Sequence, residues 1–434
     1  MSGSFRFVHA ADLHLDTPFQ GVSAAAPAVA EALQEASIQA WDAVVDLTVA
    51  REAALLVIAG DIYDGAERGV RAQLRFVEGL RRLSGAGVQT LIVHGNHDPL
   101  DGWSAIREFP SGVTVFGHDA VASVAVKIGR RTVHVHGISY RTRDLRDNLA
   151  LGYKRARGSA LNIGVLHANV GGQADHAPYS PCSLGDLEAA GMDYWALGHI
   201  HKRQVLREGS PWVAYSGDTQ GRSPKPSEMG PKGVLVVEAT GSTIDSVTFE
   251  PVDVVRFVPC QVDVRDVVDV AALQEEILGA VERLRDENGD RALLVRVTLG
   301  GRGPVAGDLR REGAVAELRD ALRDSLAGRT PFVWIESVRN AARSPIDLDA
   351  IRQRGDFSAA LLERFEALAA DGHAADEFVR RASELLDKPG QVATALRDLA
   401  DDDSGVSGAW ADAGDVLAEA LEIALGGLEA EADQ

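Results

Sequence analysis

The chain contains five short segments rich in Asp, His and Asn, side chains that bind metal ions and transfer protons. In order, they are Ala11-Asp12-Leu13-His14, Gly60-Asp61-Ile62-Tyr63-Asp64-Gly65, Gly95-Asn96-His97-Asp98, His167-Ala168-Asn169 and Gly198-His199-Ile200-His201. Each follows an apolar run of strand length. Neutral imidazoles, carboxylates and an amide oxygen together suit divalent cations such as Mn²⁺, Fe²⁺ or Zn²⁺. Five such segments, each behind its own strand, predict one shared metal site.

These segments need a framework that brings distant parts of the chain together. Apolar runs alternate with helix-length segments, which predicts an α/β domain with a largely buried sheet. Loops beyond the carboxyl ends of strands in such a sheet converge on one crevice. We expect helices at Pro27–Ala50 and Val70–Ser84. Strands are expected at Phe5–Ala10, Ala54–Ala59, Val88–Val93, Ser123–Ile128, Thr132–Ile138, Leu161–Leu166, Tyr194–Leu197, Val213–Ser216, Val234–Glu238 and Ile244–Glu250, the later ones in a second sheet packed on the first.

The spacing inside the segments adds to this expectation. Asp12 and His14 are two positions apart, as are His199 and His201. In an extended stretch such a pair points to one side, so each pair can offer two ligands to one place. Glycine directly precedes three of the polar residues, and it lets the chain turn sharply toward the crevice.

The same ligands suit chemistry with a pair of ions. Two ions about 3.5–4 Å apart activate a water molecule and clamp both oxygens of an in-line displacement at phosphorus. A single carboxylate is wanted between the ions, and Asp61 sits best for that role. The residues therefore predict metal-dependent hydrolysis of a phosphoester.

The composition of the 434 residues, 45% hydrophobic and 25% charged, is that of an ordinary soluble globular protein. We find no apolar run near the roughly 18 residues needed to span a bilayer, and no signal peptide is expected. Cys182 and Cys260 are too far apart for a local zinc knuckle, and we expect buried thiols in a reducing cytoplasm. The net charge of −20 argues against coating nucleic acid by charge alone. It argues less against an enzyme whose metal ions supply the positive field.

The order of predicted strands and helices changes near residue 254. A compact α+β unit is predicted from strands at Phe257–Val264, Ala292–Leu299 and Pro331–Val338 and helices at Val270–Asp286 and Ala314–Ala327. Helices are expected beyond it at Asp356–Ala370, Ala374–Leu386, Gln391–Ala400 and Ala409–Glu431. The chain is thus predicted to have three parts: 1–253 with the metal site, 254–340 as an α+β unit and 341–434 as a helical segment.

The order of the motifs resembles the signature of the calcineurin-like metallophosphoesterase superfamily. The stretches HAADLHLDTPF, VIAGDIYD, IVHGNHDP, LHANVGG, DYWALGHIHKRQVL and YSGDTQGR with GPKG are similar to its DNA-repair branch, the SbcD-type and YhaO-type exonuclease subunits. The resemblance covers about residues 5–250, while residues 254–340 match only in layout. It implies an α/β fold, a four-layer α/β/β/α sandwich, with a small α+β capping domain and a C-terminal helical segment.

The resemblance also implies roles for single residues. The implied ligands are Asp12, His14 and His201 for one ion and Asn96, His167 and His199 for the other. Asp61 would bridge the ions. His97 would stabilise charge or protonate the leaving oxygen, and Asp64 would orient His97. The ions would be Mn²⁺, with Fe²⁺, Zn²⁺ or Mg²⁺ as alternatives.

Basic residues and one further histidine are candidates for substrate contact. A basic cluster is formed by Arg141, Arg143, Arg146, Lys154, Arg155 and Arg157. It suits phosphate-backbone contact, although a solvated helix face explains it equally well. Other candidates are Lys202 and Arg203 after the GHIH motif, Arg222 of the QGR stretch, and His176. Where relatives often have His after QGR, this chain has Ser223, followed by the insertion Pro224–Ser227.

Three functions stay open from the sequence. The first is a Mn²⁺-dependent DNA exonuclease or endonuclease acting in DNA repair with an SMC-like coiled-coil ATPase, which the resemblance implies and to which the C-terminal helices would dock. The second is a phosphodiesterase or phosphatase for small nucleotides or phosphoproteins. The third is a scaffold subunit without turnover, against which stands the full set of expected ligands. The resemblance also allows a homodimer.

Overall fold

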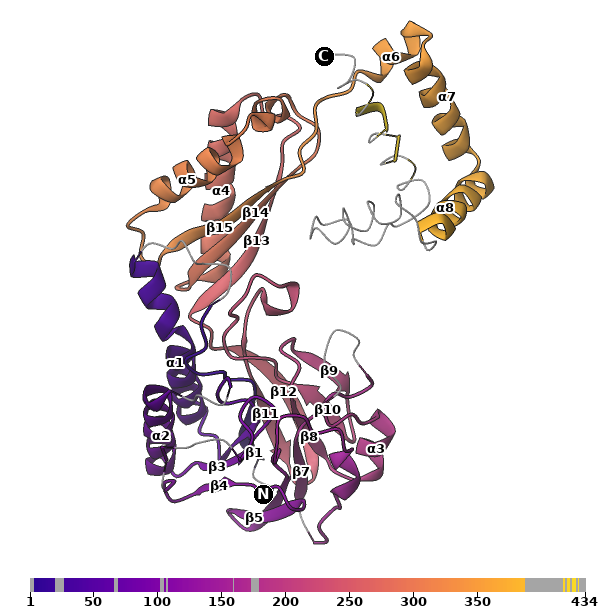
Figure 1. Ribbon diagram of the computed structural model, residues 1–434. Helices are drawn as coiled ribbons and strands as arrows, with labels where there is room; N and C mark the ends of the chain where they lie inside the picture. The colour runs from indigo at the N-terminus through magenta and orange to yellow at the C-terminus, as the bar shows by residue number, and fades with distance from the viewer. Residues whose placement is uncertain are drawn as a thin grey trace. The chain divides into compact units, whose positions relative to one another are not determined.

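The computed structural model describes residues 4–19, 27–65, 69–101, 105–106, 108–158, 160–172, 179–386, 417, 420–421, 424–426 and 428 (Figure 1). Contacts divide the chain into two units. The first comprises Met1–Val258, Glu287–Val295 and Leu326–Glu336, and the second Pro259–Asp286, Arg296–Ser325 and Ser337–Gln434. The boundary crosses the strands of the predicted α+β unit, and the three-part division stays a prediction.

The first unit contains a six-stranded sheet in the order β12-β11-β1-β2-β3-β4. Its strands are β1 (Ser4–Ala10), β2 (Leu55–Ala59), β3 (Gln89–Val93), β4 (Val113–Val115), β11 (Gly233–Thr240) and β12 (Thr243–Pro251). The strands β1 to β4 are parallel, and β11 is antiparallel to β1. The prediction that the late strands all join a second sheet is therefore wrong for β11 and β12. They return to the first sheet, where β11 covers the edge of β1 that would otherwise lack backbone partners and β12 pairs with β11.

A second six-stranded sheet has the order β5-β6-β7-β8-β10-β9. Its strands are β5 (Ala122–Ile128), β6 (Arg131–Gly137), β7 (Leu161–His167), β8 (Tyr194–Gly198), β9 (Gln204–Arg207) and β10 (Trp212–Tyr215). The central strands β6, β7, β8 and β10 are parallel. Both β7 and β8 are buried along their whole length, as expected for strands covered on both faces.

Two helices cover the outer face of the first sheet (Figure 1). They are α1 (Pro27–Ala50) and α2 (Val70–Gly85), and the ring of Trp41 in α1 packs in a tilted arrangement against that of Phe76 in α2, at a centroid distance of 4.9 Å. One apolar core lies between these helices and the first sheet, and another joins the facing sides of the two sheets. A third packs the second sheet against α3 (Leu184–Ala189) and the short helix η1 (Leu149–Gly152). The α/β/β/α order is thereby confirmed.

A third sheet, β13-β14-β15, consists of β13 (Val255–Asp263), β14 (Ala292–Gly300) and β15 (Val333–Asn340). The other helices of the described residues are η2 (Pro226–Glu228), α4 (Val270–Asn288), η3 (Pro304–Ala306), η4 (Asp308–Arg310), α5 (Ala314–Leu326), α6 (Leu348–Arg354), α7 (Phe357–Ala370) and α8 (Gly372–Leu386). The expected C-terminal helices are confirmed by α7 and α8. The predicted helix Gln391–Ala400 and most of Ala409–Glu431 lie outside the described residues.

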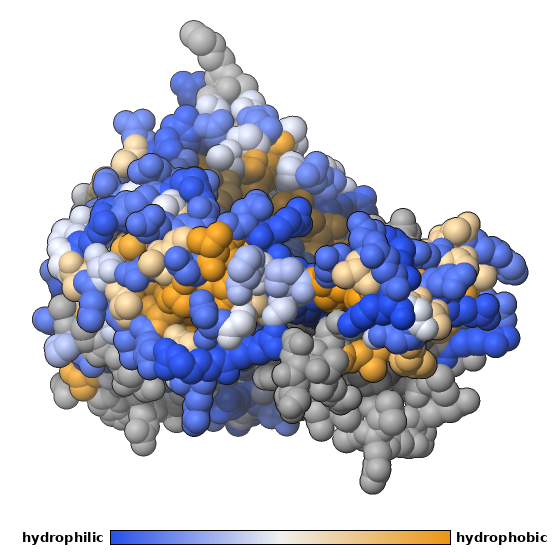
Figure 2. Space-filling model, turned by 90° about the horizontal axis from the view of Figure 1, so that it is seen from above, coloured by the Kyte–Doolittle hydropathy of each residue, from blue (hydrophilic) through white to orange (hydrophobic). Residues whose placement is uncertain are grey.

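On the face drawn in Figure 2, hydrophobic residues gather in several separate patches between hydrophilic ones. At the start of α7, the side chain of Phe357 is one of the exposed large hydrophobic residues, at 70%. Among the described residues, none of the helices combines the length and the apolar character that crossing a membrane requires.

Candidate metal centre

All five motifs follow the carboxyl ends of parallel strands, as predicted. The first three follow β1, β2 and β3, and the other two end or follow β7 and β8. Backbone hydrogen bonds hold the first two loops together: the Asp12 amide donates to the Gly60 carbonyl and the His14 amide to the Asp61 carbonyl, both at 3.0 Å. The loops after β1 and β2 thus continue the parallel pairing of their strands into the site.

Four of the polar residues have a left-handed backbone. The φ angles are 51° at Asp12, 42° at His14, 52° at Asp61 and 99° at His199. Non-glycine residues adopt positive φ uncommonly, at a cost of order 1–3 kcal/mol each, and such residues cluster at functional sites. The extended geometry that we assumed for Asp12 and His14 is therefore wrong, although their side chains do converge.

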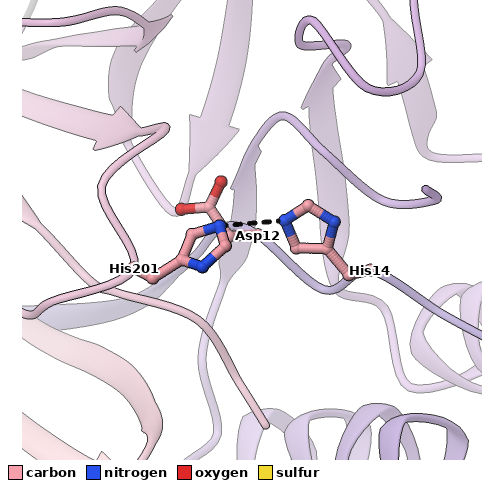
Figure 3. A group of neighbouring side chains, drawn as sticks. All are labelled: Asp12, His14 and His201. Atoms are coloured by element: carbon pink, nitrogen blue, oxygen red, sulfur yellow. Dashed lines mark hydrogen bonds between the residues drawn. The ribbon is translucent and has the colours of Figure 1, made fainter. Parts of the chain in front are cut away.

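Asp12, His14 and His201 form one cluster, whose ligand atoms all lie within 4.8 Å of one another (Figure 3). The Nε2 atoms of His14 and His201 are 3.1 Å apart. Both Asp12 and His14 are buried, with 1% exposure each. Two loops that are almost 190 residues apart in sequence thus point their side chains at one place.

A second cluster lies around His167, which is completely buried. Its Nε2 is 2.9 Å from Asn96 Oδ1, and its Nδ1 is 2.9 Å from the carbonyl of Ala59. Its ring is 5.3 Å from the ring of His199, centroid to centroid. His199 and His201 therefore have different neighbours, and the expectation that this pair serves one place is wrong.

The carboxylate of Asp61 lies between the two clusters. Its Oδ2 is 3.9 Å from His14 Nε2 and 3.3 Å from His167 Nε2. Its Oδ1 accepts a hydrogen bond of 2.9 Å from the backbone amide of His97. Asp61 thus has an oxygen facing a histidine of each cluster, which is the geometry expected of a bridging ligand.

Two of the glycines in the motifs are needed for close approach. A Cβ at Gly95 would lie 2.3 Å from Asp61 Oδ1 and 2.8 Å from His167 Nε2. A Cβ at Gly198 would lie 1.9 Å from the Ala59 carbonyl oxygen. Real side chains do not come this close, so the glycines leave the space that the ligands occupy.

His97 lies at the more open side of the site, with 29% of its side chain exposed. Its Nδ1 is 2.5 Å from Asp64 Oδ1, and its ring is 5.2 Å from the ring of His14. Arg222 is buried beside this pair, with Nη1 3.7 Å from Asp64 Oδ2. The Nε of Arg222 is buried and has no hydrogen-bond partner among the described residues.

The buried charges in the site attract positive charge. Burial lowers the pKa of His167, but the Asp61 and Asp12 carboxylates outweigh burial and raise that pKa to about 9. Burial raises the pKa of Asp12 to about 6, against the effect of His167 and His201. Burial, together with Arg222 and His201, holds the pKa of His14 well below its usual value. The centre thus combines a neutral imidazole, His14, with two carboxylates, Asp12 and Asp61, that favour a positive charge on His167.

These residues fit a divalent cation. The carboxylate of Glu228 lies 3.1 Å from Nδ1 of His201 and accepts a hydrogen bond from Nδ1–H, so the lone pair of the neutral His201 ring is on Nε2, which faces His14. Two imidazole nitrogens that bind one ion at about 2.0–2.1 Å stand about 3.0–3.4 Å apart. The observed Nε2–Nε2 distance of 3.1 Å falls in this range. The mixture of imidazole, carboxylate and amide oxygens suits the same class of ions.

The predicted substrate residues are dispersed. The segment from Arg141 to Arg157 is loop and η1, so the alternative of a solvated helix face is wrong. Arg141 and Arg143 are exposed in this loop, and their part in binding stays a prediction. Lys202 is also exposed, and Arg203 lies 4.9 Å from the centroid of the Phe249 ring, as a cation–π pair. His176 lies outside the described residues.

Glu228 and Lys232 were missed by the sequence reasoning. Glu228 contacts His201, and the Lys232 ammonium donates to the carbonyl of His201 at 3.2 Å and lies 2.8 Å from Asp218 Oδ1. The only signal in the sequence was their position after the QGR stretch and in GPKG. Asp98 of the GNHD motif accepts from the amides of Ile62 and Gly95, at 2.9 and 2.8 Å, and so fixes two of the loops.

Comparison with known proteins agrees with this geometry. Residues 5–203 match the family model of calcineurin-like phosphoesterases, and residues 257–343 match that of the middle domain of metallophosphoesterase YhaO. The uncharacterized metallophosphoesterase YhaO of Bacillus subtilis is 36% identical over 330 residues, which cover 76% of this chain and 79% of that protein. This chain belongs to the calcineurin-like metallophosphoesterases of the YhaO family.

The metallophosphoesterase is also similar to proteins of nucleic-acid metabolism. The SbcD component of the nuclease SbcCD of Bacillus subtilis is 26% identical, over 54% of this chain and 66% of that protein. The DNA double-strand break repair protein Mre11 of Thermoplasma acidophilum is 26% identical, over 48% of this chain and 57% of that protein. The family uses divalent metals, in keeping with the clusters described above.

Proposed function

We propose that this metallophosphoesterase is a two-metal nuclease that hydrolyses phosphodiester bonds of DNA. The observation that carries the proposal is the position of Asp61, whose Oδ2 faces His14 of one cluster and His167 of the other. Similarity to a nuclease subunit and to a DNA double-strand break repair protein supports DNA as the substrate. DNA repair is the corresponding role.

The residues of the two clusters would hold the ions. The proposed ligands are Asp12, His14 and His201 for one ion, Asn96, His167 and His199 for the other, and Asp61 for both. When bound, a pair of Mn²⁺ ions supplies an activated water and stabilises charge on the phosphoryl oxygens. The protein contributes buried side chains that are fixed before substrate arrives, which lowers the cost of organising the site during the reaction.

His97 and Asp64 act on the leaving group in this proposal. Nδ1–H of His97 donates a hydrogen bond to Asp64 Oδ1, which leaves Nε2 as the second donor of the protonated ring. Burial lowers the pKa of His97, but the hydrogen bond to Asp64 and the charge of Asp61 outweigh burial and raise it. This shift favours the protonated form of His97, and in the proposal that form donates a proton from Nε2 to the leaving oxygen.

Arg222 is proposed to bind a non-bridging oxygen of the scissile phosphate. Its guanidinium lies beside Asp64, with Nη1 3.7 Å from Asp64 Oδ2, and a planar guanidinium matches the oxygens of a phosphate. The exposed residues Arg141, Arg143, Lys202 and Arg203, with His176, are proposed to contact the flanking strand.

We further propose that the C-terminal segment docks on an SMC-like coiled-coil ATPase. In α7 and α8 the aromatic residues Phe357 and Phe378 are exposed, at 70% and 40%, which supports contact with a partner. A homodimer stays part of the proposal. A cytoplasmic location fits the two free, buried thiols of Cys182 and Cys260.

The test is an assay of the purified protein with Mn²⁺ on linear duplex DNA, single-stranded DNA and bis-p-nitrophenyl phosphate. The proposal expects cleavage of DNA, and a parallel His97→Ala sample should lose turnover and keep its metal. Turnover of the small ester without DNA cleavage would favour a small-molecule phosphodiesterase. Absence of all turnover would favour a scaffold, and full DNA cleavage by His97→Ala would refute the assigned roles.

A further inference from the structure

Glu228 is a buried carboxylate that stands outside the proposed ligand sets. It ends η2, directly after the insertion Pro224–Ser227, and only 11% of its side chain is exposed. Burial of an ionised carboxylate is costly unless its oxygens are paired. Both oxygens of Glu228 have partners, and these partners belong to two different parts of the centre.

The first partner of Glu228 is His201, one of the proposed ligands. Its Oε1 is 3.1 Å from His201 Nδ1. In metal sites a carboxylate on the far nitrogen of a histidine holds the tautomer and the ring orientation that the metal needs. Oε1 therefore keeps the proton on Nδ1 and directs Nε2 toward His14 and Asp12.

The second partner is the backbone of the QGR turn. Oε2 accepts hydrogen bonds from the amides of Arg222, at 2.7 Å, and Ser223, at 3.2 Å. A Cβ at Gly221 would lie 2.3 Å from the carbonyl oxygen of Glu228, so the turn packs tightly on this residue. One carboxylate thus joins the His201 loop to the segment that carries Arg222.

Lys232 makes the same connection by a separate route. Its Nζ donates to the carbonyls of His201, at 3.2 Å, and Ser227, at 2.6 Å, and lies 2.8 Å from Asp218 Oδ1. The cluster of His201, Asp218 and Glu228 therefore already contains a cation, which argues against a third metal ion there.

We propose that Glu228 is a positioning residue that fixes the tautomer of His201 and ties this ligand to the turn of Arg222. The inference rests on the proposed function, because it takes His201 as a ligand. A Glu228→Gln variant keeps one oxygen for the two backbone amides and turns its NH₂ group to His201 Nδ1. That amide favours the His201 tautomer with the proton on Nε2, which cannot bind a metal ion.

The experiment is a calorimetric titration of the full-length protein with Mn²⁺, without substrate. We expect two ions in the wild type, and in Glu228→Gln a 10- to 100-fold weaker affinity for one ion with the other unchanged. The exposed residue Glu208 provides the matched control, Glu208→Gln, which should bind as the wild type does. If Glu228→Gln binds both ions with the same affinities as the wild type, the inference is overturned.

If Glu228 only stabilised the fold, Glu228→Gln would weaken Mn²⁺ binding whether or not His201 is present. In a His201→Ala background, the further change Glu228→Gln should leave Mn²⁺ binding unchanged, and additional weakening would overturn the inference. If Glu228→Gln does not fold, Glu228→Asp replaces it in the test, because the shorter side chain places its carboxylate one methylene short of His201. Weaker binding of one ion is then expected, and normal binding of both ions would overturn the inference. A wild type that binds fewer than two ions instead refutes the proposed function.

Discussion

Replacing Asp64 by Asn isolates the proton-donating role of His97. Asp64 Oδ1 is 2.5 Å from His97 Nδ1, and a hydrogen bond between two charged groups contributes about 1.5–3 kcal/mol. Because 35% of the Asp64 side chain is exposed, we take the lower part of this range, about 1.5–2 kcal/mol. If this interaction stabilises the proton-donating form of His97, its loss lowers kcat about 10- to 30-fold.

The pH dependence carries the sign of the effect. The net shift of the pKa of His97 is upward, against burial, because Asp64 and Asp61 outweigh it. The protonated form therefore persists to higher pH in the wild type than it would without Asp64. In Asp64→Asn the alkaline limb of kcat should move to lower pH, so the deficit is largest in alkaline solution and shrinks on acidification. The assay is initial rates on duplex DNA at saturating Mn²⁺ across the pH range.

A matched control exists on the surface. Asp119 Oδ1 is 3.2 Å from His118 Nδ1, and its side chain is 95% exposed, so Asp119→Asn should leave the profile unchanged. Metal content is the decisive companion measurement, because His14, Asp64 and His97 also lie close enough to hold an ion. If Asp64→Asn lost an ion, or scaled kcat down without moving the alkaline limb, the assigned role would be refuted.

Three further predictions follow from the same geometry. Gly95→Ala places a methyl group 2.3 Å from Asp61 Oδ1 and should lower kcat about 100-fold in DNA cleavage assays; near-normal rates would contradict the tight packing. Arg222→Gln should raise KM for DNA or lower kcat at least tenfold while calorimetry still counts two ions, and an unchanged kcat/KM would count against phosphate contact. Burial lowers the pKa of His9 to about 3, so the unfolded chain alone takes up this proton below pH 6.5 and stability falls as pH falls. Between pH 6.5 and 5 this amounts to about 1.6 kcal/mol, and denaturant midpoints should fall less steeply for His9→Gln; parallel curves would exclude this cause.

The predicted site depended on a rule that the chain obeys. Polar residues behind apolar runs meet when the strands are parallel, and β1, β2, β3, β7 and β8 all present their carboxyl ends to the centre. The rule needs no knowledge of which sheet a strand joins. The predicted site was therefore unaffected by the wrong assignment of β11 and β12. Their periodicity identifies them as strands but does not show which strands they pair with.

What was missed depends on contacts between distant segments. The positive φ of Asp12 and Asp61 is held by hydrogen bonds between the loops after β1 and β2, which local spacing cannot reveal. The Glu228 carboxylate is held by a hydrogen bond from His201, 27 positions earlier, and the sequence indicated only the insertion that precedes Glu228. The helix α3 is six residues long, too short for a periodic signal, and its capping box at Ser183 and Asp186 is the better clue.

A crystal of the full-length protein grown with excess Mn²⁺ tests the central claim most directly, through anomalous scattering measured at the manganese edge. We expect two peaks about 3.5–4 Å apart on either side of the Asp61 carboxylate, one beside His14 and His201 and the other beside Asn96 and His167. A single peak, or one held by His97 and Asp64 instead, would contradict the central claim.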